Sequence, residues 1–220
     1  ERRPAVETAH RVRQRISGVF VYAIACGIAE TDPAAIIKDA LQPVRRGRQP
    51  AVVDLEDLKT LLNDAEAIPA HPQTRLALRL LALTAIRSGE VRRAHVGEFE
   101  GLDGDNPLWC IPAERMKMSR DFWVPLSRQA VDVVRVAAST AGPAGLLFPS
   151  QRHAHKPISE NAMGYLLNRA GYHGRHVPHG FRASFSTIMN ERHPEDSKII
   201  DFMLAHKPKG TVEAAYNRAM

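Results

Sequence analysis

The sequence predicts an α+β fold that is mostly α-helical and contains one small three-stranded antiparallel sheet. Apolar residues recur at helical spacing through most of the chain. Between residues 96 and 126 this spacing gives way to three short apolar runs separated by turn-forming residues. A stretch rich in proline and arginine, 42–50, sets the first part of the chain apart from the rest. We therefore predict two domains, 1–48 and 49–220, with the sheet in the second.

The first domain is predicted to hold two helices and a linker. Residues 9–28 should form an amphipathic helix. Thr31 and Asp32 precede a proline, which is typical of a cap, and the short helix that follows should end near Lys38. The linker carries two prolines, a glycine and three arginines, so it should be extended and exposed.

The second domain should begin with two core helices, one capped by Asp54 and one starting near Gln73. The predicted strands are Val96–Phe99, Leu108–Ile111 and Phe122–Leu126, in an antiparallel meander. Ser127 should cap a helix through Ala138, and Ser159 another through Arg169. The stretch 178–220 should form three helices interrupted at Pro194 and Pro208.

Composition and charge restrict the class of protein. The chain is 44% hydrophobic and 25% charged, which is ordinary for a globular protein and excludes disordered and fibrous classes. The charge-free stretch 16–29 is too short to span a membrane. Two distant cysteines favour a reducing, intracellular setting. The first residue is Glu rather than Met, which indicates a chain cut from a longer one.

The excess of positive charge lies at the two ends. Lys and Arg exceed Asp and Glu by nine to five in residues 1–50 and by ten to six in 151–220, whereas 51–150 hold eleven against thirteen, so the three segments carry +4, −2 and +4. Such a distribution suits a clamp on a polyanion as well as an ordinary solvated surface.

Two short motifs could bind an anion. His179 and Arg182 follow Pro178 at the start of a predicted helix and could converge on the same oxygen atoms. Arg87 follows an apolar helix, where Ser88 and Gly89 should make a turn that projects it, and Glu90 could hold its guanidinium. Each motif could equally be an ordinary structural one, with His179 capping a helix and Arg87 in a surface pair.

The residues alone do not identify a nucleophile. Tyr216 lies near the end of the chain, but judged by its neighbours Tyr172 is at least as good a candidate, whereas Tyr22 and Tyr165 should lie in the core. The spacing of His173, His176 and His179, with two upstream histidines, leaves a zinc-dependent hydrolase open, although Gly171, Gly174 and Pro178 would break the helix this needs.

Six residues together resemble the tyrosine recombinase family, in particular phage and genomic-island integrases. They are Arg87 in A-I-R-S-G-E, Lys117 in I-P-A-E-R-M-K-M, His179 and Arg182 in H-G-F-R, His206 in L-A-H and Tyr216 in A-A-Y-N-R, in the family's order. Residues 1–48 resemble the last helices of the core-binding domain with its linker, and 49–220 resemble the catalytic domain. Ser88 and Gly89 stand where many relatives carry Thr or Pro followed by Gly.

The resemblance implies a reaction and a role for each residue. Tyr216 would attack a DNA phosphate to give a 3′-phosphotyrosine, while Arg87, Arg182 and His206 hold the non-bridging oxygens. Lys117 would be the general acid, His179 would assist Tyr216 or bind the phosphate, and Glu90 would support Arg87. No metal or other cofactor is expected.

The resemblance also implies partners. These are double-stranded DNA at attachment sites, three further copies in a tetramer on DNA, and DNA-bending accessory proteins. The expected location is the cytoplasm of a bacterial host, at the nucleoid when the protein is bound to DNA. No membrane partner is expected. Basic residues could contact phosphate or bases. They are Arg45, Arg46, Arg48, Arg120, Arg169, Arg175, Lys207 and Lys209.

The expected function is integration or excision of a mobile element. A nicking-closing enzyme like type IB topoisomerases and an inactive DNA-binding regulator are the alternatives.

Overall fold

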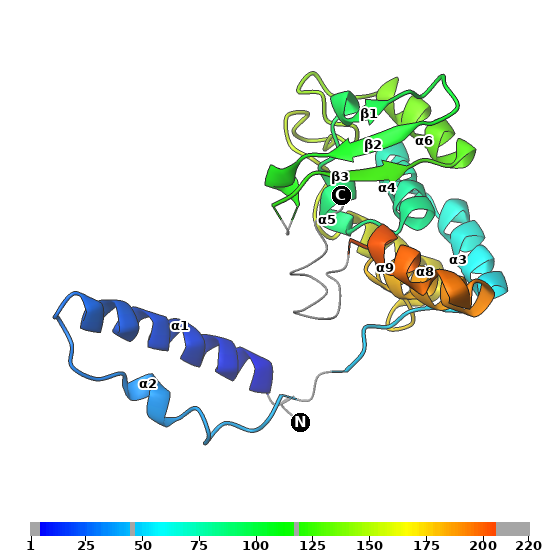
Figure 1. Ribbon diagram of the computed structural model, residues 1–220. Coiled ribbons are helices and arrows are strands. Elements are labelled where there is room, and N and C mark those ends of the chain that lie inside the picture. The colour runs from blue at the N-terminus through cyan, green and yellow to red at the C-terminus, as the bar shows by residue number, and fades with distance from the viewer. Residues whose placement is uncertain (1–4, 45–46, 117–118, 206–220) are drawn as a thin grey trace. The chain divides into compact units, whose positions relative to one another are not determined.

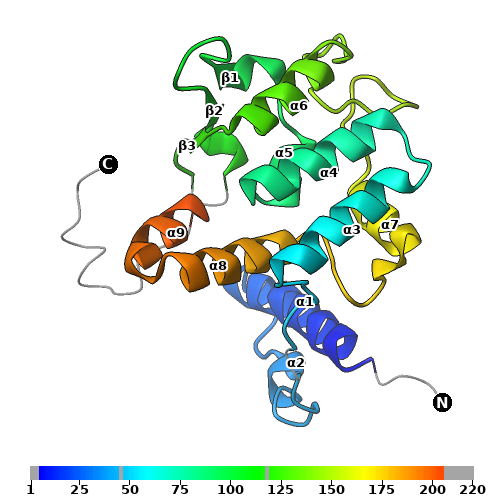
Figure 2. The same ribbon diagram turned by 90° about the vertical axis from the view of Figure 1, so that its right-hand side faces the viewer.

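A computed structural model describes residues 5–44, 47–116 and 119–205 of the chain. The chain divides into two compact units, Glu1–Arg48 and Gln49–Met220. Figures 1 and 2 show the elements of each unit from two directions.

The first unit is a helical pair. Helix α1 spans Val6–Ala25, and the short helix α2 spans Pro33–Ile36. Asp32 caps α2 by accepting from the backbone N–H of Ala34 at 2.8 Å, and it also accepts from the hydroxyl of Ser17 on α1 at 2.5 Å. The expected cap is therefore confirmed, and its carboxylate also joins the two helices.

Tyr22 does not lie in a core, contrary to the sequence-based expectation. Its side chain is 72% exposed, and Val12, Ile16 and Val19 of the same helix are also exposed. Among the described residues of this unit, 5–44 and 47–48, α1 has only the four-residue α2 as a helical partner, which is too little surface to cover an apolar stripe twenty residues long.

The second unit opens with two core helices and a short third one. Helix α3 spans Leu55–Ala67, α4 spans Pro72–Thr84 and α5 spans Ser88–Arg92. Asp54 caps α3 through the N–H groups of residues 56 and 57, both at 2.9 Å, as predicted. The ring of His71 caps α4, with Pro72 in the first turn.

The predicted meander is present, with its first strand displaced. Strands β1 (Phe99–Glu100), β2 (Leu108–Ile111) and β3 (Phe122–Pro125) pair antiparallel in the order β1-β2-β3. Residues 96–98, expected in the first strand, form a 3₁₀ turn, because the N–H of Val96 donates to the carbonyl of Gly145 at 2.9 Å instead of to a neighbouring strand. A second 3₁₀ turn, Ala113–Arg115, follows β2.

Helices complete the unit. Helix α6 (Arg128–Ala138) is capped by Ser127 as predicted, and α7 (Ala162–Leu167) runs into a π-helical turn, Asn168–Tyr172. Ser159 was expected to cap α7 but lies in the turn before it, where its carbonyl accepts from the N–H of Ala162 at 3.1 Å. Helix α8 spans Gly180–Arg192, a 3₁₀ turn spans Pro194–Asp196 and α9 spans Ser197–Met203. The helix expected after Pro208 lies outside the described residues.

A single apolar core holds these elements together. Helix α4 lies at its centre and contacts both α6 and α7. Fully buried side chains come from the helices, from β2 and from the loop between α6 and α7. They include Leu61, Leu80, Leu81, Trp109, Ile111, Phe148, Met163, Leu166 and Leu167.

Tyr165 was expected in this core, but it is 62% exposed. Helix α7 buries Met163, Leu166 and Leu167, which share one face at helical spacing, so Tyr165 falls on the opposite face. None of the helices in residues 5–44, 47–116 and 119–205 is long and apolar enough to span a membrane.

Candidate active site

Arg87 is positioned by a sharp reversal between two helices. Helix α4 ends at Ala85, which adopts a left-handed conformation with φ of 51° and whose N–H donates to the carbonyl of Leu81 at 2.9 Å. Arg87 then precedes the first turn of α5. The turn predicted at Ser88 and Gly89 is therefore wrong by a few residues, because Ala85 makes the reversal and the Ser-Gly pair opens α5.

Glu90 supports Arg87 from inside the fold. Its carboxylate lies 3.6 Å from Nη1 of Arg87, and the side chains are 6% and 27% exposed respectively. The pair is thus partly buried rather than a surface pair. Burial raises the pKa of Glu90, while the neighbouring Arg87 and Arg182 act in the opposite direction. One carboxylate oxygen, Oε2, is buried without a hydrogen-bond partner in the part of the chain that the structure describes.

Arg182 joins two other segments of the site. The residue is 6% exposed on α8; its Nη1 donates to the carbonyl of Ala85 at 2.9 Å, and its Nη2 donates to the carbonyl of Leu204 at 2.5 Å. Burial, with repulsion from Arg87, lowers the pKa of Arg182 to about 10, so the group is still a cation at neutral pH. It therefore connects the end of α4 with the end of α9.

His179 lies at the N-cap position of α8. It is the last residue before the helix and is exposed, and its side chain does not cap the helix. Pro178 precedes this cap position, so it is not in the first turn as expected. The carbonyl of His179 accepts from the N–H of Arg182 at 3.2 Å, which places the two residues one turn apart.

These contacts assemble a cationic centre from three segments. Arg87, Arg182 and Glu90 interact electrostatically, and two guanidinium groups around one buried carboxylate leave a net positive charge. A positive centre preorganised by buried contacts is suited to binding an anion and to stabilising charge that accumulates on it.

Several predicted site residues lie outside the described residues. They are Lys117, His206 and Tyr216, together with Arg45, Arg46, Lys207 and Lys209. Of the remaining predicted DNA contacts, Arg48, Arg120, Arg169 and Arg175 are all exposed, and the guanidinium of Arg175 lies 5.0 Å from the centre of the Tyr172 ring.

Tyr172 is a poor nucleophile in this structure. Its ring is buried, and its hydroxyl donates to Oδ2 of Asp64 at 2.8 Å. Burial and the Asp64 carboxylate raise the pKa of this phenol, which disfavours the phenolate that an attack on phosphorus requires. This environment removes the main competitor of Tyr216.

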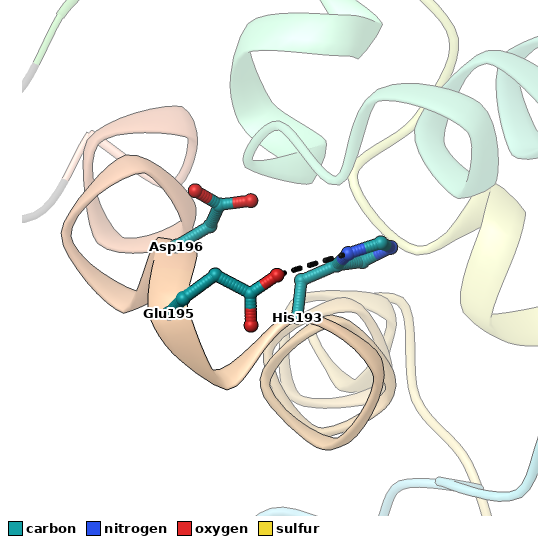
Figure 3. A group of neighbouring side chains, drawn as sticks. All are labelled: His193, Glu195 and Asp196. Atoms are coloured by element: carbon teal, nitrogen blue, oxygen red, sulfur yellow. Dashed lines mark ion pairs between the residues drawn. The ribbon is translucent and has the colours of Figure 1, made fainter.

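The histidines predicted as a possible zinc site do not form one. Nδ1 of His176 is occupied by the N–H of Val52 at 3.0 Å, and the ring is fully buried. The metal-capable group of three side chains in the described part of the chain lies elsewhere, at His193, Glu195 and Asp196, whose candidate ligand atoms are within 4.8 Å of one another. Figure 3 shows this group just before α9, with the ion pair between His193 and Glu195 marked. Nδ1 of His193 lies 3.8 Å from Oε1 of Glu195, both residues are exposed, and Asp196 is half-buried.

Sequence reasoning missed Arg115. Its Nη2 forms an ion pair with Glu98 at 3.2 Å and donates to the carbonyl of Glu90 at 3.1 Å. Arg115 therefore connects the segment after β2 with α5, the helix that contains Glu90. The arginine stands in the hairpin motif quoted for Lys117, but nothing in its spacing indicated an acceptor in α5.

Comparison with known proteins shows the family to which the chain belongs. Residues 51–220 match the model of the phage integrase family, and residues 1–40 match that of the phage integrase central domain. The chain belongs to the phage integrase family.

Individual relatives agree with this assignment. Prophage integrase IntZ of Escherichia coli (strain K12) is 34% identical over 217 residues, 99% of this chain and 52% of the relative. The integrase of Shigella phage Sf6 is 32% identical over 220 residues, 100% of this chain and 56% of the relative. The chain thus spans about half the length of the curated relatives it matches.

Solved structures show the same fold. A lambda integrase dimer bound to a COC′ core site has a TM-score of 0.64 at 20% identity, covering 98% of this chain and 61% of that one. A lambda integrase tetramer bound to a Holliday junction has a TM-score of 0.65 at 20% identity, covering 94% and 61%. The expected fold class, a mostly helical α+β tyrosine recombinase fold with a small three-stranded antiparallel sheet, is confirmed.

Proposed function

We propose that this chain is the catalytic part of a site-specific DNA recombinase that cleaves and rejoins DNA through a 3′-phosphotyrosine intermediate, integrating or excising a mobile element. The observation that carries the proposal is that Arg182 donates to the carbonyl of Ala85, two residues before Arg87, while Arg87 pairs with the buried carboxylate of Glu90. Both arginines are among the six residues whose order resembles tyrosine recombinases.

The chemistry follows from these groups. The phenolate oxygen of Tyr216 attacks a backbone phosphorus, and the bond from phosphorus to the 5′-oxygen breaks. Lys117 supplies a proton to the departing 5′-oxygen, and His179 accepts or shares the proton of Tyr216. A 5′-hydroxyl of a second duplex then attacks the phosphorus of the phosphotyrosine, and the bond from phosphorus to the Tyr216 oxygen breaks. The number of phosphodiester bonds is therefore conserved, and no ATP is consumed.

The arginines stabilise the charge that builds up on the phosphate. Arg182 uses two of its five N–H groups on backbone carbonyls, which leaves three for non-bridging oxygens. Since the same two bonds fix its position, little reorganisation is needed when the phosphate becomes more negative. Arg87, held by Glu90, and His206 would complete the set.

Partners follow from the same proposal. Lambda integrase is described on DNA as a dimer and as a tetramer. For this protein we propose double-stranded DNA as substrate, a tetramer on paired attachment sites, DNA-bending accessory proteins, and action at the nucleoid in the cytoplasm of a bacterial host. The exposed arginines 48, 120, 169 and 175 are candidate phosphate contacts.

The direct test is covalent trapping. The complete protein is incubated with a nicked suicide duplex containing an attachment site, and the protein–DNA adduct is resolved on a denaturing gel. We expect an adduct from the unmodified protein and none from Tyr216→Phe or Arg87→Ala, whereas Tyr165→Phe, a change at an exposed tyrosine, should leave the yield unchanged. An undiminished adduct from Tyr216→Phe would reject the proposed nucleophile.

Two further measurements separate the alternatives. Exchange of strands between two marked duplexes supports a recombinase, whereas relaxation of a supercoil without exchange supports a topoisomerase-like enzyme. The absence of any adduct from the unmodified protein supports a DNA-binding regulator. EDTA should leave the adduct yield unchanged, because the charge on the phosphate is met by side-chain cations; loss of the adduct in EDTA would contradict the proposed chemistry.

A further inference from the structure

The backbone of Val52 is held on both sides by side chains from the region of α8. Its N–H donates to Nδ1 of His176 at 3.0 Å, and its carbonyl accepts from Oγ of Ser184 at 2.5 Å. His176 and Ser184 are both completely buried. We call this arrangement of Val52, His176 and Ser184 the clasp.

The backbone of α8 packs closely against the residues beside the clasp. A Cβ added at Gly180 would lie 2.7 Å from the carbonyl oxygen of Pro50 and 3.2 Å from the His176 ring. That ring also packs against Phe181 at 4.5 Å between centres, with the planes 63° apart. Segment 50–52 and the first turn of α8 are therefore in direct contact, and only glycine fits at position 180.

The contact requires one particular form of His176. A backbone N–H can only donate, so Nδ1 must carry a lone pair and the proton must be on Nε2. Nε2 is buried without a partner in the described part of the chain, and burial lowers the pKa of His176 to about 4. The ring is therefore neutral at neutral pH, and its acceptor atom remains available to Val52.

The position of the clasp relates it to the candidate active site. His176 precedes His179 by three residues, and Ser184 follows Arg182 by two, so the clasp brackets both proposed site residues on α8. Arg182 in turn holds the carbonyls of Ala85 and Leu204. A shift of this helix would thus move Arg182 relative to Arg87.

We propose that His176 and Ser184 are positioning residues, which fix α8 by holding the backbone of Val52 where the chain enters the catalytic unit. The inference rests on the proposed recombinase function. Pro50, the last residue of the predicted linker, precedes Val52 by two positions, so the start of the catalytic unit is attached to the helix that carries His179 and Arg182. Loosening the clasp should slow DNA cleavage more than it weakens DNA binding.

The test compares substitutions in the complete protein. His176→Phe keeps a ring of similar size but removes the acceptor, His176→Asn restores an acceptor close to the position of Nδ1, and Ser184→Ala removes the other bond. His173→Phe is the matched control, because His173 is exposed and precedes His176 by three residues. For each protein we would measure the single-turnover rate of adduct formation on the suicide duplex, the Kd for uncleavable duplex, and hydrogen exchange of the amide of Val52 without DNA.

The expected pattern is a loss of rate at nearly constant affinity. His176→Phe should slow adduct formation by about tenfold or more with Kd changed by less than about threefold, since small displacements of charged groups cost mainly transition-state stabilisation. His176→Asn should recover most of the rate, and Ser184→Ala should show a smaller loss. Both His176→Phe and Ser184→Ala should accelerate exchange at Val52, and His173→Phe should behave like the unmodified protein.

Other results would overturn the inference. These are an unchanged rate in His176→Phe, a parallel loss of rate and affinity, or an Asn variant no better than the Phe variant. If His176→Phe does not fold, Ser184→Ala decides the question by the same criteria. If the unmodified protein gives no adduct, the proposed function fails, and exchange at Val52 still decides whether the clasp exists.

Discussion

Acidification should destabilise the catalytic unit through His176. The ring is completely buried, and its pKa falls from 6.5 to about 4 on folding. The unfolded chain therefore binds this proton more readily than the folded one, so the stability contributed by the neutral ring is present above pH 6.5 and is lost as the pH falls toward 4. At 1.36 kcal/mol per unit of pKa, the free energy of unfolding should drop by about 2 kcal/mol between pH 7 and pH 4.5.

Urea denaturation at these two pH values provides the measurement, with His176→Phe as the reference. Other groups titrate in the same interval; Glu90, for example, has a raised pKa and acts in the opposite direction, since protonation favours the folded state. These contributions are common to both proteins and cancel in the difference. The unmodified protein should lose about 2 kcal/mol more than the variant. Equal losses in the two proteins would refute the assignment of a buried neutral ring at position 176.

Three further substitutions test the fold and the site. Asp54→Ala removes both cap bonds of α3 and should cost about 1 kcal/mol in thermal or urea denaturation, whereas Glu56→Ala in the same turn should cost only a few tenths; equal costs would contradict the cap. Tyr172→Phe should lower stability by about 1 kcal/mol through loss of its bond to Asp64, yet leave adduct formation intact, and an abolished adduct would reinstate it as a nucleophile. Arg182→Lys should abolish adduct formation at unchanged protein concentration and lower the melting temperature, because a single ammonium cannot reproduce the planar fork that reaches both backbone carbonyls; a fully active Lys variant would argue against this role.

Local signals predicted the elements well. Asp32, Asp54 and Ser127 are caps in the structure because a cap depends only on a side chain and the next two or three N–H groups. Strand β2 was predicted with its correct bounds, since its apolar run lies between strong turn signals.

Predictions that depended on distant parts of the chain were less accurate. The first strand was misplaced because a loop residue, Gly145, takes the N–H of Val96. Tyr22 and Tyr165 were expected in the core but are exposed, because burial is decided by which face of a helix meets a partner.

The site could be predicted only in part. The order of its motifs indicated which residues belong together, and the structure brings Arg87, Glu90 and Arg182 into one centre. The contacts that hold Arg182 could not be read from the sequence, because its acceptors are main-chain carbonyls at Ala85 and Leu204, which carry no signature in residue type. The clasp at Val52 was missed for the same reason.

The use of main-chain acceptors has a consequence for how such a site changes during evolution. Every amino acid at positions 85 and 204 brings the same carbonyl oxygen, so replacement there cannot remove the partners of Arg182 as long as the backbone keeps its path. The hydrogen bonds to Arg182 therefore restrict the path and length of the two segments, whereas residue type is restricted by the left-handed backbone at Ala85 and by the burial of the side chains of Ala85 and Leu204. Related chains should accordingly keep small or apolar residues at these two positions and keep the spacing from them to Arg87 and His206.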